Sequence, residues 1–324
     1  MPHLLRRLAG ALVLVWLVVT LTFVLVRAAP GDAAQLLVPP GASASDEEKL
    51  RAEFGLDAPV VVQYARWVGG ALMGNFGESF SQRRPVRAVI ADALPVSLGL
   101  GVASLALTYL LGVAIGLAQA ARRGAVDTAI TVATTAVYAA PSFWLGLAAI
   151  ALATHGAATL GLPAALRLPA FGLRSAASDA TGVDALVDLI RHAILPVAVL
   201  AAIGAAGVAR YTRASAVALW SLDWVRTARA KGASRARVQW RHVLANALPP
   251  LVILFALALP GVVAGSVFVE SVFAWPGMGR ALVQAIAARD MPVVLGCTVA
   301  YAALVIVANL AVDLVLPRLD PRRR

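Results

Sequence analysis

The sequence predicts an all-α polytopic membrane protein with six transmembrane helices. Of its 324 residues, 60% are hydrophobic and only 14% are charged, and the mean hydropathy is +0.81. Soluble domains do not have this composition. The apolar residues form long uncharged runs, and basic residues gather between those runs, as in membrane proteins. The formal net charge of +11 therefore indicates orientation in a membrane and not a surface that binds nucleic acid.

Six apolar runs account for the transmembrane helices, because a helix needs about 20 apolar residues to cross a bilayer. The first run also fits a cleavable signal peptide, since two arginines precede it and two alanines follow it. Its length and the further runs behind it favour an uncleaved helix. The fourth run is the shortest and can be extended if Arg or His side chains snorkel. The six runs are 8–26, 93–121, 128–154, 193–209, 243–269 and 291–312.

These runs divide the chain into three parts. Residues 1–28 form an N-terminal transmembrane helix, residues 29–92 form an external loop, and residues 93–324 form a core with five transmembrane helices. The loop contains SASDEEKLRAEFG, in which Ser45 is expected to cap a short amphipathic helix ahead of three acidic residues.

Basic residues in the connecting segments set the orientation. The N-terminus, the loop after the second run, the loop after the fourth run and the C-terminal tail hold 16 Lys and Arg against 4 acids. The alternate segments hold 12 Lys and Arg against 13 acids. Because positive charge collects on the cytoplasmic side, both termini are expected in the cytoplasm.

The most informative segment is the basic loop at residues 210–242. It holds eight Lys and Arg residues and a single acid, Asp223. A polar, Gly-centred segment between two spans can bind a soluble cytoplasmic partner, or it can lie on anionic lipid. On the residues alone, the two interpretations are equally good.

Small residues and prolines in the runs predict close helix packing and kinks. G-x-x-x-G pairs let helix backbones approach, and prolines bend or break a helix. These residues are Gly112 with Gly116, Gly261 with Gly265, and Pro141, Pro196 and Pro260. Almost no charge lies within the runs, whereas a proton- or sodium-driven carrier more often buries an ionisable group there.

The sequence does not favour an enzyme, a metal or a cofactor. The two lysines, Lys49 and Lys231, lie in no Walker A motif, so any energy from ATP must come from another subunit. The single cysteine, Cys297, lies in an apolar run, and the four histidines have no metal-ligand spacing. Glu270 and Asp290 are best explained as residues at the external boundary of the membrane.

Short motifs in a fixed order carry a resemblance over nearly the whole chain. They are APGD (29–32), FGLDAP (54–59), GNFGES (74–79), RHAILP (191–196), RYTR (210–213), TARAKG (227–232), VESVF (269–273), PGMG (276–279), RDMP (289–292) and LDPR (319–322). In this order the chain resembles the permease subunits of ATP-binding-cassette importers of the dipeptide, oligopeptide and nickel family. Asn75 stands where this family usually has an acid.

The resemblance implies the type I importer permease fold and gives the basic loop a role. Such loops form a short helix that docks into a groove on a cytoplasmic ATPase. The expected coupling residues are Arg226, Thr227, Ala228, Lys231 and Gly232. The general signature of importers is E-A-A-x-x-x-G, and here an arginine and a threonine replace its first two residues. Ala228 and Gly232 are four apart, so they are expected to share a helix face, and Gly232 is also able to end the helix.

The resemblance also implies the assembly. The expected partners are a second homologous permease subunit, two cytoplasmic ATPase subunits, an extracytoplasmic solute-binding protein and membrane lipid. The permease is expected in the bacterial or archaeal plasma membrane, where alternating access would carry peptides or a related solute such as a nickel chelate. The alternative is a self-sufficient secondary transporter or channel, which needs no ATPase.

Overall fold

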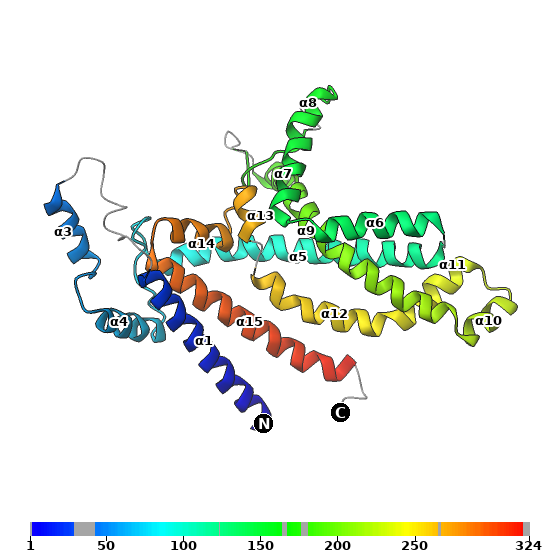
Figure 1. Ribbon diagram of the computed structural model, residues 1–324, viewed down its shortest axis with the longest axis horizontal. Helices are drawn as coiled ribbons and strands as arrows, with labels where there is room; N and C mark the ends of the chain where they lie inside the picture. The colour runs from blue at the N-terminus through cyan, green and yellow to red at the C-terminus, as the bar shows by residue number, and fades with distance from the viewer. Residues whose placement is uncertain are drawn as a thin grey trace. The chain divides into compact units, whose positions relative to one another are not determined.

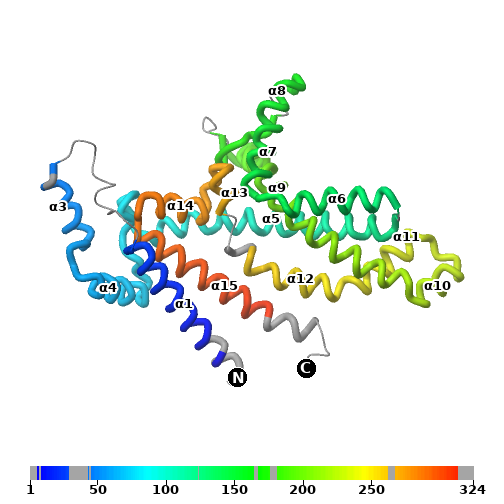
Figure 2. The backbone as a smooth tube through the Cα atoms, viewed as in Figure 1, coloured from blue at the N-terminus to red at the C-terminus, as the bar shows by residue number. Residues whose placement is uncertain are grey.

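The computed structural model describes residues 2–28, 43–122, 124–163, 167–175, 181–264 and 267–319 (Figures 1 and 2). The regular elements of these residues are helices, apart from one isolated bridge between Glu78 and Pro85. Six helices of the described chain are long and apolar enough to cross a membrane, as the sequence predicts. They are Ala9–Ala28, Val86–Ala121, Ser142–Thr159, Gly182–Trp220, Arg235–Gly261 and Met291–Val312.

The chain forms two compact units. The first unit contains Met1–Ser97 and Pro276–Val307, and the second contains Leu98–Trp275 and Ala308–Arg324. Two helices, α5 (Val86–Ala121) and α15 (Met291–Leu319), contribute to both units. Residues 276–307 of the predicted core region thus pack with the N-terminal part of the chain.

The third predicted span is wrong in its bounds. Residues 128–154 do not form one helix, because the chain breaks between α6 (Ala125–Ala139) and α7 (Ser142–Ala151). The break is at Ala140, whose extended backbone has φ −74° and ψ 136°, the conformation that a following proline imposes. α7 continues through a π-helical turn, η1 (Leu152–Gly156), into α8 (Ala157–Thr159), and this continuous helix is the candidate span.

The fourth span is longer than its apolar run. α9 extends over Gly182–Trp220 and includes Pro196 without a break. The apolar run 193–209 is bounded by charged residues, but a helix does not have to end at a charge. The charged residues on either side of the run continue the same helix. α9 therefore carries Arg210 and Arg213 as helical residues.

The first unit packs α1 (Pro2–Ala28), α3 (Ala44–Glu53), α4 (Val60–Leu72) and α14 (Met278–Ala287) around the beginnings of α5 and α15. One core cluster joins Val86 and Val89 of α5 to Met278 of α14 and Val293 of α15. The N-cap of α3 is Ser43 and not Ser45 as expected, so the helix begins at Ala44, with Ser43 and Asp46 forming a capping box.

A buried acid joins two segments of the first unit that lie far apart in the sequence. The Asp290 carboxylate accepts hydrogen bonds from the hydroxyls of Ser79 (2.6 Å) and Ser81 (2.7 Å) and from the Ser81 amide (2.9 Å). Asp290 and Glu270 are fully buried within the protein, and Asp290 directly precedes the candidate span Met291–Val312. Asn75 is the residue expected to be an acid from the family resemblance. Its side-chain oxygen accepts a hydrogen bond from the Gly77 amide at 3.0 Å, and a carboxylate would accept the same hydrogen bond.

The second unit is organised by the crossing of α5 and α9. A Cβ atom on Gly116 would lie 2.5 Å from the Ala209 carbonyl oxygen, and one on Gly112 would lie 2.6 Å from Val208 Cβ. The first predicted G-x-x-x-G contact is thus confirmed. α12 (Leu244–Ala264) packs against this pair through Ala247 and Leu251, and α13 (Val267–Val272) follows it.

The second glycine pair is not part of such a contact within the described chain. Gly261 of α12 faces open space, and Gly265 lies outside the described residues.

Candidate functional site

Residues 210–220 of the basic loop belong to α9, and the rest of the loop folds as two short helices on the core of the second unit. α10 covers Asp223–Ala230, α11 covers Arg235–Arg237, and a π-helical turn, η3 (Val238–Val243), leads into α12. α10 is strongly amphipathic. Trp224, Val225 and Ala228 share one face and pack against a buried cluster on α5, α9 and η3. That cluster contains Leu117, Ala120, Ala216, Val238 and Val243.

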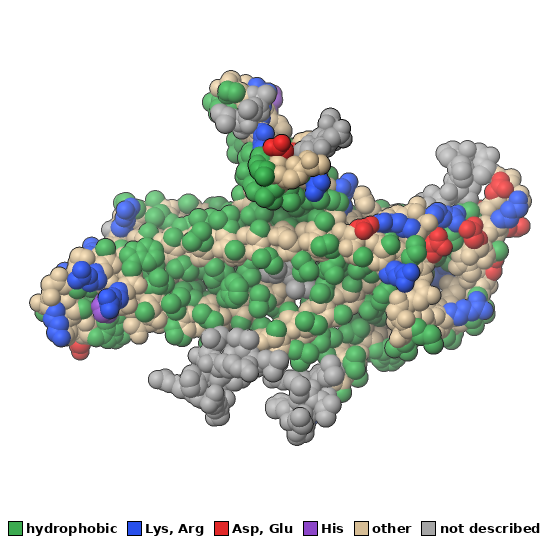
Figure 3. Space-filling view, turned by 180° about the vertical axis from the view of Figure 1, so that it is seen from behind, with side chains coloured by type: hydrophobic (Ala, Val, Ile, Leu, Met, Phe, Trp, Pro, Cys, Tyr) green, Lys and Arg blue, Asp and Glu red, His purple; other side chains and the backbone are tan. Residues whose placement is uncertain are grey.

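The opposite face of α10 is exposed. It presents Arg226, Thr227 and Ala230, with Arg229 and Lys231 beside them. Lys and Arg side chains gather at this end of the second unit (Figure 3). Arg226 pairs with Asp223 at 3.3 Å, but both side chains are exposed, so this pair contributes little stability. The basic side chains of this face are therefore accessible to a partner.

Gly232 ends the helix and turns the chain. Its φ is +83°, a left-handed conformation that L side chains rarely adopt. The Gly232 amide donates to the Arg229 carbonyl at 2.9 Å, and the Ala233 amide donates to the Ala228 carbonyl at 3.1 Å, which is the Schellman motif. The predicted role of Gly232 as a helix terminator is confirmed.

The structure separates Ala228 from Gly232. Gly232 lies beyond the last helical residue, so the two do not share a helix face as expected. Ala228 is half-buried in the core cluster together with Ala233, and this contact accompanies the Schellman motif. Of the five expected coupling residues, Arg226, Thr227 and Lys231 are exposed side chains on or beside the outer face of α10, whereas Ala228 supports the helix from behind.

Arg235 ties the loop to the ends of two long helices, which the sequence did not indicate. Its guanidinium lies 5.7 Å from the centre of the Trp220 ring at the end of α9, and it also donates to the Ala121 carbonyl at the end of α5. A positive charge at a helix C-terminus is favourable, because it faces the negative end of the helix dipole. Arg235 therefore holds the base of α10 and α11 in place.

An ion pair braces the same end of the unit. Arg213 of α9 donates from Nε and Nη2 to the two Asp127 oxygens of α6, at 2.7 and 2.5 Å. These hydrogen bonds lower the pKa of the Asp127 carboxyl, which lies outside the candidate spans. Gln119 of α5 donates to Thr131 of α6 at 3.0 Å beside the pair. The one signal in the sequence was that Asp127 is the sole acid among the basic residues of its loop.

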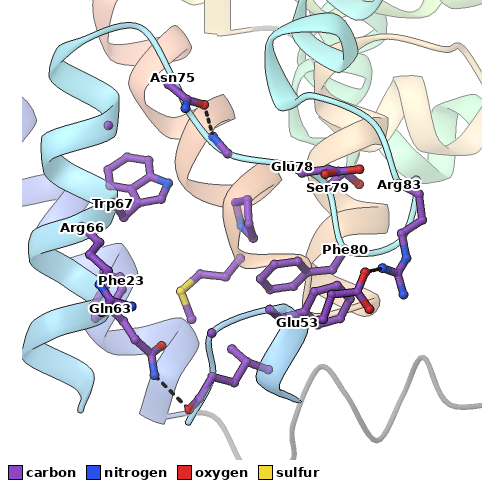
Figure 4. Close-up of a pocket in the computed structure, with 17 residues that line it drawn as sticks. Phe23, Glu53, Gln63, Arg66, Trp67, Asn75, Glu78, Ser79, Phe80 and Arg83 are labelled. Carbon is purple, nitrogen blue, oxygen red and sulfur yellow. Dashed lines mark hydrogen bonds and ion pairs between the residues drawn. The ribbon is translucent and has the colours of Figure 1, made fainter. Parts of the chain in front are cut away.

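A cleft in the first unit is the other candidate site, and Figure 4 shows its lining. It has a volume of about 380 Å³ and lies between α1, α4, the loop around Ser79 and the start of α15. Aromatic residues and two arginines, Arg66 and Arg83, face it, and Arg83 pairs with Glu53. Within the described residues, no group of three or more His, Cys, Asp or Glu side chains is arranged to hold a metal ion.

The long apolar helices are those of a polytopic membrane protein, and a basic helix is displayed on the loop between two of them. The chain belongs to the family of binding-protein-dependent transport system inner membrane components, whose model matches residues 109–324. The N-terminal model of the same family matches residues 1–101.

Relatives match over almost the full length. The chain is 35% identical to the oligopeptide transport system permease protein AppB of Bacillus subtilis over 322 residues, covering 99% of this chain and 98% of that one. It is 36% identical to the di/tripeptide transport system permease protein DppB of Pseudomonas aeruginosa, covering 95% of this chain and 94% of that one. Among solved structures, the inward-facing MetNI methionine ABC transporter matches with a TM-score of 0.51 and 15% identity, covering 72% of this chain and 97% of that chain.

The family decides the class of function. The chain is a multi-pass inner membrane permease subunit of an ATP-binding-cassette importer, and it works with ATPase subunits and a solute-binding protein. Family membership overturns the alternative of a self-sufficient secondary transporter or channel.

Proposed function

We propose that this permease subunit imports peptides or a related small solute by alternating access, paired with a second homologous permease subunit. Its full-length relatives AppB and DppB are peptide permeases, which supports the substrate class. Both termini and the basic loop face the cytoplasm in this proposal, because the positive charge of the chain collects there.

The outer face of α10 is the contact with the ATPase. The observation that carries this proposal is the division of the helix into two faces. Trp224, Val225 and Ala228 fix the inner face to the core, so a push on the outer face moves α5 and α9 with it. Rigid-body coupling of this kind transmits the closure of the ATPases to the membrane helices.

Each coupling residue then has a distinct task. Arg226, Thr227 and Lys231 contact the ATPase from the exposed face. Ala228 and Gly232 act indirectly, since Ala228 fills the space against the core and Gly232 ends the helix so that the loop stays compact.

Bulk on the outer face of α10 tests the docking. Ala230 is small and exposed in the last turn of α10, so Ala230→Trp leaves the inner face unchanged. We expect this variant to insert normally but to lose most co-purification with the ATPases and most peptide uptake. The matched control is Ala52→Trp, which places the same bulk in the last turn of the exposed helix α3 and is expected to change neither readout.

The lipid-surface interpretation predicts another ranking. If the loop only lies on anionic lipid, Ala230→Trp is tolerated, and function is lost only when several positive charges are removed. Normal uptake and normal ATPase binding in Ala230→Trp would refute docking through this face. Uptake of labelled tripeptides by the assembled importer, compared with a nickel chelate, separately tests the substrate class.

A further inference from the structure

α4 carries an apolar stripe along one side. Val61, Ala65, Val68 and Leu72 recur at i, i+4, i+7 and i+11, so they line up on one face of the helix. The polar residues Gln63 and Arg66 lie on another face, and both line the cleft, as Figure 4 shows.

The described part of the chain leaves the two ends of this stripe open, whereas Val68 between them is half-buried. None of the residues of α4 is buried. Val61 is 77% exposed, Leu72 is 84% exposed, and Met73, directly after the helix, is 89% exposed. Large apolar side chains this exposed on one side of a helix indicate contact with a partner or a lipid surface.

The third side of α4 packs along α1. The Tyr64 hydroxyl hydrogen-bonds the Thr20 hydroxyl at 2.5 Å, and the Tyr64 ring meets the Phe23 ring edge-on with centroids 5.1 Å apart. Trp67 joins Phe23 in the same buried cluster. α4 is therefore fixed against the body of a membrane span and is not held only at the end of that span.

The position along α1 gives the depth of this contact. The candidate span of α1 is Ala9–Ala28, and 20 helical residues extend about 30 Å, the thickness of the hydrocarbon core. Thr20 lies eight residues before Ala28, so Tyr64 reaches about 12 Å inward from that end of the span. On the same part of α1, Leu21 and Leu25 are 59% and 61% exposed, as residues that face lipid are.

We propose that α4 is a membrane-surface helix embedded in the leaflet where α1 ends, with its apolar stripe on the lipid acyl chains. Lipid is favoured over a protein partner because the stripe is apolar throughout and α4 lies along the part of α1 where Leu21 and Leu25 are exposed. Arg66, on the cleft side, is placed to meet phospholipid headgroups. This assignment does not depend on the cargo or on the ATPase contact.

Site-directed spin labelling measures the surroundings of the stripe directly. In a Cys297→Ser background, nitroxides are attached at Val61→Cys and Leu72→Cys, and the assembled importer is reconstituted in phospholipid nanodiscs. Collision rates are measured with oxygen, which concentrates in lipid, and with a water-soluble nickel complex. Leu21→Cys on α1 is the lipid reference, and Glu48→Cys on the exposed face of α3 is the water reference.

The expected result is that both stripe positions match Leu21→Cys, with high oxygen and low nickel collision rates. Nickel accessibility like that of Glu48→Cys would overturn the proposal, because the stripe would then face water. Low collision rates with both reagents would also overturn it, since a protein partner would then cover α4.

Discussion

Adding one methyl group at the α5–α9 crossing should weaken the fold. In Gly116→Ala the new Cβ would lie 2.5 Å from the Ala209 carbonyl oxygen, 2.6 Å from Thr212 Cβ and 3.0 Å from the Arg213 amide nitrogen. Two of these three atoms belong to the backbone, so a rotamer change cannot relieve the contact. The two helices must move apart by a few tenths of an ångström to an ångström.

The expected cost follows from overpacking. Forcing an extra carbon into a packed contact typically costs about 1–3 kcal/mol, while Gly→Ala in a helix regains up to about 1 kcal/mol of propensity. We therefore expect the free energy of unfolding to fall by roughly 1–2 kcal/mol. Loss of helicity during titration with SDS, followed by circular dichroism on the purified protein, measures this change.

Gly99→Ala is the matched control on the same helix. A Cβ atom there meets nothing within 4 Å, so only the gain in propensity remains, and stability should be unchanged or slightly higher. Equal stability of Gly116→Ala and Gly99→Ala would show that the α5–α9 contact is looser than the structure indicates, and the reasoning would fail.

Three further predictions test other features. Gly232→Leu should lose ATPase co-purification, because a φ of +83° strains a leucine. Gly232→Asn should retain more of this co-purification, because asparagine tolerates the left-handed conformation. Equal co-purification of the two variants would argue against the strained turn. Asp290→Ala leaves the Ser79 hydroxyl buried without its acceptor and should cost about 2–4 kcal/mol of stability in the same SDS titration, with native-like stability as the contrary result. Cysteines at Ser45 and Ala236, in a chain lacking Cys297, should react with membrane-impermeant maleimide from opposite sides of the membrane; labelling of Ser45→Cys only from the cytoplasm would reject the proposed orientation.

Local signals predicted the features that depend on a short stretch of chain. The number of spans follows from the length of apolar runs, and the described residues also form six candidate spans, although the third has other bounds. The end of α10 at Gly232 was predictable because glycine adopts positive φ without strain. The close approach of helices at Gly112 and Gly116 was predictable because glycine has no side chain to hold two backbones apart. The third predicted span is wrong because an uncharged run does not show whether a proline in it bends one helix or, as Pro141 does, separates two.

Tertiary packing decided the rest. A helical repeat shows that α10 has two faces, but the core cluster decides that Ala228 faces inward and that Arg226 and Thr227 face out. Asp290 and Ser79 are 211 residues apart, and no local pattern predicts such a pairing. The apolar stripe of α4 is visible in the sequence, but its depth became measurable only once the Tyr64–Thr20 bond placed the helix against α1. Composition and periodicity are properties of one segment, so they specify helices and their faces, whereas the surface that each face meets depends on the segments brought against it by the fold.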